Sequence, residues 1–118
     1  ENIENAKKFT SNFSEYIRFY IKDSLVFLKE FNNPIDLLYL DSLDGHNPIA
    51  ASNHQLQEAQ IAINRLHNKS LILLDDKGSK TNLSINFFKE NKYKIIFETD
   101  YQVLLSKWLR FIVLFDKN

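Results

Sequence analysis

Cysteine and methionine are both absent from the 118 residues of this chain. Without cysteine, neither a disulfide nor a thiolate metal site can form, and cysteine usage gives no indication of the cellular compartment. Because the sequence begins at Glu1 and contains no methionine, we expect it to be a piece of a longer translation product.

Glycine is almost as scarce, with Gly45 and Gly78 the only two in the sequence. A nucleotide-binding α/β domain normally carries a glycine-rich turn near its start, where the backbone approaches the phosphates. Either the chain is not such a domain, or the part that carries this turn is missing from it.

Long apolar runs and an excess of one charge are also lacking. No stretch is long enough to span a bilayer, and no secretory signal is recognisable. Fifteen basic residues balance fifteen acidic ones, which gives no electrostatic reason to expect nucleic acid or a membrane as a partner. A chain of this length can build one core. We therefore expect a single domain over residues 1–118 and, by default, a cytoplasmic protein.

Two apolar stretches of the sequence end on acids. Residues 37–40 (LLYL) run into Asp41, and residues 71–74 (LILL) run into Asp75 and Asp76. Neither stretch alternates with polar residues, which predicts strands that are buried on both faces, as in a parallel sheet. Because open α/β sheets bind ligands at the carboxyl ends of their strands, we expect these acids to lie together on one rim.

The other segments predict helices and strands in alternation, which is typical of an α/β fold with a parallel sheet. Two β-rich runs close together near the end predict an antiparallel hairpin. The run 108–115 fits either a strand extension or a terminal helix. The expected helices cover residues 1–15, 25–31, 52–66 and 81–91, and the expected strands cover residues 17–22, 35–40, 71–74, 93–98 and 101–106.

Side chains with capping chemistry precede two of these helices. Asp23 or Ser24 can cap the helix over residues 25–31. Ser52, with Gln55 three residues later, forms a capping-box pattern at the start of the next helix. The segment before it, residues 42–51, carries turn residues and is expected to be a loop.

Five segments have an order and spacing that resemble the later half of a class I S-adenosylmethionine-dependent methyltransferase. In that family the sheet has seven strands, the last two forming an antiparallel hairpin. The resemblance starts at the third strand, so it implies a mostly parallel Rossmann-like sheet lacking the first two strands and the glycine-rich cofactor loop, in a fragment or truncated relative. The five segments are residues 19–24 (FYIKDS), 35–42 (IDLLYLDS), 54–59 (HQLQEA), 70–76 (SLILLDD) and 101–107 (YQVLLSK).

The resemblance implies roles for several of these residues. Asp23 matches the acid that contacts the adenine of S-adenosylmethionine, with Ser24 beside it, and Asp41 matches the acid near the methyl-transfer site. In members similar to catechol O-methyltransferase, acids at the positions of Asp41, Asp75 and Asp76 hold magnesium, although the last of them is an asparagine there. Magnesium takes oxygen ligands and lowers the pKa of a bound hydroxyl. The simpler interpretation is that these aspartates cap turns or end strands in solvent.

Two histidines are candidates for a general base, because imidazole titrates near neutrality. His46 lies with Asp44 in the loop after Asp41, and His54 begins the following helix. A surface or capping role is the simpler interpretation of each. His67 is expected to end a helix, without a chemical role.

Other classes of function compete with a methyltransferase that acts on a small hydroxylated molecule. A magnesium-dependent phosphotransfer domain requires a different spacing, since Asp44 follows Asp41 by three residues where a phosphatase motif has two. A non-catalytic interaction module is favoured by the missing glycine-rich turn. In such a fragment, open sheet edges and apolar residues such as Trp108, Phe111 and Phe115 favour a homo-oligomer.

Overall fold

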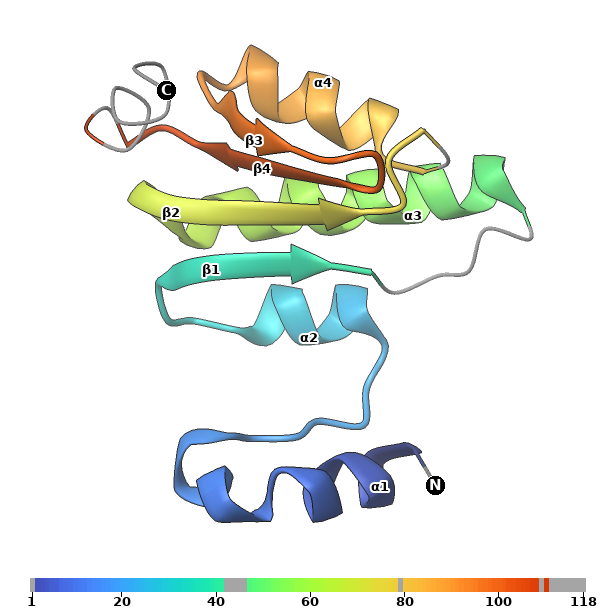
Figure 1. Cartoon of the computed structure of the whole chain (residues 1–118), viewed down its shortest axis with the longest axis vertical. Helices are drawn as coiled ribbons and strands as arrows, with labels where there is room; N and C mark the ends of the chain where they lie inside the picture. The colour runs from blue at the N-terminus through green and yellow to red at the C-terminus, as the bar shows by residue number, and fades with distance from the viewer. Residues whose placement is uncertain (1, 42–46, 79, 109, 111–118) are drawn as a thin grey trace.

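The computed structural model describes residues 2–41, 47–78, 80–108 and 110 (Figure 1). They form an α/β structure with one open sheet of four strands in the order β1-β2-β4-β3. Strands β1 (Ile35–Leu40) and β2 (Leu66–Asp75) are parallel. Strand β4 (Gln102–Ser106) is antiparallel to β2 and to β3 (Lys94–Glu98), which confirms the predicted hairpin.

Helices connect the strands and cover the sheet. The connection from β1 to β2 contains a long helix, because parallel neighbours cannot be joined by a tight turn. The predicted helices at 25–31 and 81–91 are confirmed within one or two residues at each end. The α-helices are α1 (Asn2–Phe9), α2 (Ser24–Glu30), α3 (Pro48–Ala62) and α4 (Asn82–Glu90), and the 3-10 helices are η1 (Ser11–Tyr16) and η2 (Ile63–Arg65).

The hydrophobic core lies on one face of the sheet. Alternate residues of the strands point to this face and meet apolar side chains of α2, α3 and α4. Burial of these side chains is the main favourable contribution to folding. The core residues are Leu28 of α2, Leu38 and Leu40 of β1, Ala59 and Ala62 of α3, Ile72 and Leu74 of β2, Ile85 and Phe88 of α4, Tyr93, and Val103 and Leu105 of β4.

The opposite face of the sheet, which we call the open face, carries exposed apolar side chains, and the prediction that β1 is buried on both faces is wrong. Leu37 and Tyr39 of β1 keep 59% and 49% of their surface exposed, and Phe97 of β3 keeps 52%. Strand pairing places Leu73 of β2 beside Tyr39, and Leu104 of β4 beside Leu73 and Phe97. Among the described residues, helices α2, α3 and α4 pack on one face of the sheet. The residues of β1 therefore differ in burial from one face to the other, although residues 37–40 are all apolar.

The predicted strand at residues 17–22 does not form. Ile17 has an extended backbone, with φ −123° and ψ 132°, but none of the four described strands pairs with this segment. Extended residues become a strand only when their backbone groups bond to a second strand. The expected helix over residues 1–15 is also divided: α1 ends at Phe9, η1 begins at Ser11, and Phe13 departs from helical geometry within η1.

The long helix α3 begins earlier than the capping box predicts. Asn47 caps it by accepting a hydrogen bond from the Ala50 N–H at 3.2 Å, and Pro48 occupies the first turn. Proline suits this position because its fixed φ is helical and its missing N–H would have no partner there. Of the unplaced run 108–115, residues 109 and 111–115 lie outside the described residues.

Candidate functional site

The N-terminus of α2 holds the two residues predicted to bind the cofactor. Asp23 Oδ1 accepts hydrogen bonds from the N–H groups of Leu25 at 2.9 Å and Val26 at 3.4 Å. This confirms the predicted cap, which satisfies donors that the first helical turn leaves without a partner. The adenine contact implied for Asp23 stays a prediction.

Ser24, the next residue, contacts one of the predicted bases. Its Oγ lies 3.0 Å from Nε2 of His54 on α3, and Oε2 of Glu58 lies 3.7 Å from the same nitrogen. In a nucleophilic triad the carboxylate holds Nδ1 while the hydroxyl meets Nε2. Because both groups gather at Nε2, the arrangement positions the imidazole of His54 but does not prepare Ser24 as a nucleophile.

A cavity of about 430 Å³ opens between α2, β1 and α3. Its walls combine apolar side chains with a few polar groups, the mixture typical of small-molecule sites. Glu58 is only 2% exposed and contributes a carboxylate from within the core. The polar lining residues are Ser24, Tyr39, Asp41 and Glu58, and the apolar ones are Phe27, Leu28, Leu38 and Leu40.

The predicted acidic rim forms beside this cavity, at the carboxyl ends of β1 and β2. The Tyr39 hydroxyl lies 3.0 Å from Asp75 Oδ2 and 3.3 Å from Asp41 Oδ2. The Lys80 ammonium lies 3.0 Å from Asp41 Oδ1 and 3.3 Å from Asp76 Oδ2. The predicted acids thus belong to one network with a phenol and an ammonium, and we call these five side chains the rim cluster.

The pKa values of the rim cluster follow from these contacts. Burial alone would lower the pKa of Lys80, but its bonds to Asp41 and Asp76 outweigh burial and raise it. Burial would raise the pKa of Asp75, but hydrogen bonds from the Asp76 N–H and the Tyr39 hydroxyl outweigh this and lower it. Burial and the neighbouring carboxylates together raise the pKa of Tyr39 to about 12. At neutral pH the phenol is therefore neutral and the ammonium is charged.

The donor set does not fit the magnesium ion that the resemblance implies at the rim. Asp41 and Asp76, two of the predicted ligands, hold an ammonium between them. A divalent cation needs converging oxygens, and a lysine ammonium supplies only donors and a like charge. Within the described part of the chain, no group of at least three His, Cys, Asp or Glu side chains is arranged to hold a metal ion.

The three histidines have different outcomes. His46, with Asp44, lies among residues 42–46, outside the described residues. His54 contacts Ser24 next to the cavity. His67 belongs to β2, where a helix end was expected, and its Nε2 lies 2.6 Å from Asp36 Oδ1 on β1.

Sequence reasoning missed Lys80 and Glu58. Lys80 follows Asp76 by four residues, but in a segment that was not expected to be helical, where this spacing gives no signal. Glu58 carried a weak signal, because it follows His54 by four residues within an expected helix. Such spacing puts two side chains close together on a helix. It is so common on exposed surfaces that it does not distinguish a buried charge from a solvated one.

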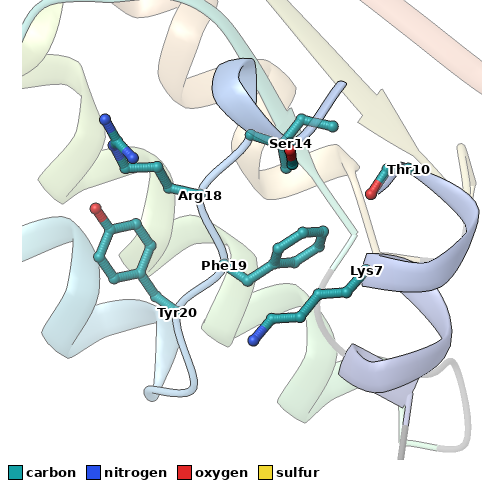
Figure 2. A pocket seen from close by; sticks show the side chains of 7 residues that line it. Lys7, Thr10, Ser14, Arg18, Phe19 and Tyr20 are labelled. Carbon is teal, nitrogen blue, oxygen red and sulfur yellow. The ribbon is translucent and has the colours of Figure 1, made fainter. Parts of the chain in front are cut away.

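A second cavity, of about 440 Å³, lies between α1, η1 and the segment that follows them. Figure 2 shows that Arg18 and Tyr20 point to one side of this extended segment, whereas Phe19 points to the other side, toward Lys7 and α1. The two cationic side chains of the lining therefore do not converge. The cavity offers no focused site for an anion.

Comparisons with protein-family models, with curated proteins and with solved structures found no match to this chain. The described helices include none with the length and apolarity needed to cross a bilayer.

Proposed function

We propose that this chain forms the later half of a Rossmann-like, S-adenosylmethionine-dependent methyltransferase domain. The observation that supports the proposal best is the cavity of about 430 Å³ beside β1. It is lined by Ser24 from the start of α2 and by Asp41 from the end of β1. The resemblance assigns these two residues to the cofactor and to the methyl-transfer site.

The chemistry of the cavity suits the cofactor. Apolar walls from α2 and β1 provide a surface for an adenine ring, and Ser24 and Glu58 provide a hydroxyl and a carboxylate for polar groups of the nucleoside. Carboxylates at Asp41 and Glu58 complement a positively charged sulfonium. S-adenosylmethionine, when bound, supplies an electrophilic methyl group.

The arrangement of strands supports the same proposal. Parallel strands followed by an antiparallel hairpin are what the resemblance implies for the later part of the sheet. The unpaired segment at residues 17–22 matches the third strand of that sheet. In the family's sheet this strand pairs with one of the first two strands, so its extended, unpaired backbone among the described residues is compatible with the proposal.

The acceptor that we propose is a small hydroxylated molecule. A general base near the cavity would remove the proton of the acceptor hydroxyl as the methyl group is transferred. His54 is the described histidine beside the cavity, with Nε2 at 3.0 Å from the lining residue Ser24. Asp41 lies on the rim of the same cavity and would accept a hydrogen bond from that hydroxyl.

Isothermal titration of the folded chain with S-adenosylhomocysteine tests the proposal. We expect saturable binding that Ser24→Ala weakens by about threefold to tenfold, the effect of one hydrogen bond. Ser11→Ala, an exposed serine on η1, is the matched control and should bind like the parent. Asp23→Asn keeps the helix cap while removing the charge, so it separates an adenine contact from capping.

Absence of binding to a chain with a cooperative unfolding transition would contradict the proposal for this chain. So would binding that Ser24→Ala and Ser11→Ala affect equally. The titration should be repeated with magnesium present, because the cofactor proposal does not depend on a metal.

A non-catalytic interaction module is the second candidate, and the open face of the sheet favours it. Leu37, Tyr39 and Phe97 lie on this face with about half of their surface exposed, and apolar patches of this kind mark contact surfaces. Sedimentation velocity over a range of protein concentrations tests self-association. Leu37→Asp should abolish any dimer formed through this face, whereas Phe9→Asp on α1 should leave it unchanged.

A further inference from the structure

Three carboxylates close together at a sheet edge repel one another unless a positive charge lies among them. Asp41, Asp75 and Asp76 are brought together by the parallel pairing of β1 and β2. The resemblance implies that magnesium supplies this positive charge. In the structure, a side chain of the protein supplies the positive charge instead.

Lys80 is the source of that charge. Its side chain is only 1% exposed, and a buried ammonium is unfavourable unless carboxylates and hydrogen bonds surround it. Asp41 and Asp76 meet this need with contacts of 3.0 and 3.3 Å. They come from different strand ends, so Lys80 links the β1 edge to the β2 edge.

The turn after β2 is shaped to return Lys80 to the rim. Asp76 has φ +60°, a left-handed conformation that is uncommon for residues other than glycine, and Gly78 has φ +85°. The Lys80 N–H then donates to the Asp76 carbonyl at 3.3 Å, and the Lys77 N–H donates to the Tyr101 carbonyl at 2.8 Å. The turn reverses direction within a few residues, which brings Lys80 back over the acids.

We infer that the Lys80 ammonium takes the place of a divalent cation, so that the acidic rim of this chain is organised without a metal. The two strand-end acids that would ligate a metal instead hold the ammonium. Tyr39 adds one neutral hydroxyl donor between two of these acids, at 3.0 Å from Asp75 Oδ2 and 3.3 Å from Asp41 Oδ2. This inference does not depend on the cofactor proposal, since it concerns charge balance within the folded chain.

The first arm of the test uses the unmodified chain. Thermal unfolding and isothermal titration are measured with Mg²⁺ and then with Ca²⁺, each against a K⁺ control of matched ionic strength. We expect no saturable binding and no rise in the unfolding midpoint. Saturable binding of either ion that Asp41→Asn removes would overturn the inference.

The second arm removes the ammonium. Lys80→Ala removes the ammonium and its volume, so that the negative carboxylates remain with space for an ion. Lys80→Met also removes the ammonium but keeps most of the side-chain volume. We expect Mg²⁺ or Ca²⁺ to raise the unfolding midpoint of Lys80→Ala by several degrees at about 100 times the dissociation constant, and to have a smaller effect on Lys80→Met. Lys77→Ala, which removes a charge from the same turn, is the control that should not respond.

A Lys80→Ala variant that folds but does not respond to either ion would show that the ammonium does not occupy a cation position. If Lys80→Ala fails to fold without an ion, recovery of the folded state on adding Ca²⁺ is the expected result. Failure to recover would contradict the inference. The unmodified chain provides its own test in either event.

Discussion

Two parts of this chain use the same kinds of apolar residue with opposite results. In the sheet and its three covering helices, Phe88 and Leu74 have no exposed surface. In the N-terminal segment, residues 2–22, Phe9 keeps 88% of its surface exposed and Tyr16 keeps 79%. Figure 1 shows this segment on the far side of α2, away from the sheet. An amphipathic pattern becomes a core only where another element packs against it.

The largest expected difference between the two parts comes from a matched pair of phenylalanines. Phe88 packs edge-to-face against Phe87 and Tyr93, with ring centroids 5.4 and 5.3 Å away. Phe88→Ala should lower the free energy of unfolding by about 3–5 kcal/mol through lost burial and a residual cavity. Phe9→Ala should change it by less than about 0.5 kcal/mol. Urea unfolding followed by circular dichroism measures both, and equal effects would show that the N-terminal segment is packed.

Charged pairs sharpen the same comparison at a smaller scale. Lys80→Met removes the buried ammonium and leaves Asp41 and Asp76 without their shared cation. We expect the free energy of unfolding to fall by about 2–3 kcal/mol. This is less than for a fully buried pair, because both acids are partly exposed. Lys22→Met breaks an exposed pair with Glu30 that is shorter, at 2.6 Å, yet should cost at most about 1 kcal/mol. If the shorter pair contributed more in the same urea titration, burial would not be the deciding factor.

High pH should destabilise the sheet through Tyr39 and Lys80 of the rim cluster. A phenol whose pKa is raised to about 12 by folding keeps its proton when the unfolded chain has lost it. Stability should therefore fall as the pH rises from about 10 to about 12. The raised pKa of Lys80 acts with the same sign, since its stabilising charge is complete below the unfolded pKa and is lost as the pH rises through the folded one. Tyr39→Phe should reduce this alkaline loss, as measured by unfolding midpoints at several pH values.

The smallest expected effect comes from deleting residues 1–16. No side chain of residues 3–22 is fully buried, so the free energy of unfolding should change by less than about 0.5 kcal/mol. The deletion leaves the contact between the Tyr20 and Phe27 rings, at 4.8 Å, in place. A loss of more than 1 kcal/mol, or a lower slope of unfolding free energy against urea, would show that the deleted residues belong to the cooperative unit.

Local signals in the sequence predicted much of the fold. The cap at Asp23, the helix over α4 and the hairpin of β3 and β4 depend on neighbouring residues, and each formed as predicted. The strand at residues 17–22 failed because pairing is not a local property. A segment with strand-forming residues stays extended and unpaired when no second strand is beside it.

The site was predictable only in part, for a similar reason. The parallel strands bring Asp41 and Asp75 to one edge, as their positions after apolar runs predicted. The burial of the Lys80 ammonium was not predicted, because it depends on a left-handed backbone conformation at Asp76 for which the sequence gives no signal. Glu58 was missed because a glutamate in a helix is exposed far more often than it is buried.

One side chain, Asp41, belongs to both the cavity and the rim cluster. Its Oδ1 accepts from the Lys80 ammonium and its Oδ2 from the Tyr39 hydroxyl. A molecule in the cavity that engages this carboxylate competes with two internal donors, and the turn that carries Lys80 is held by the same bonds. A molecule that weakened these bonds on binding would therefore loosen the turn. By the same coupling free energy, a change that strengthened the bonds of the turn to Asp41 would weaken binding of that molecule.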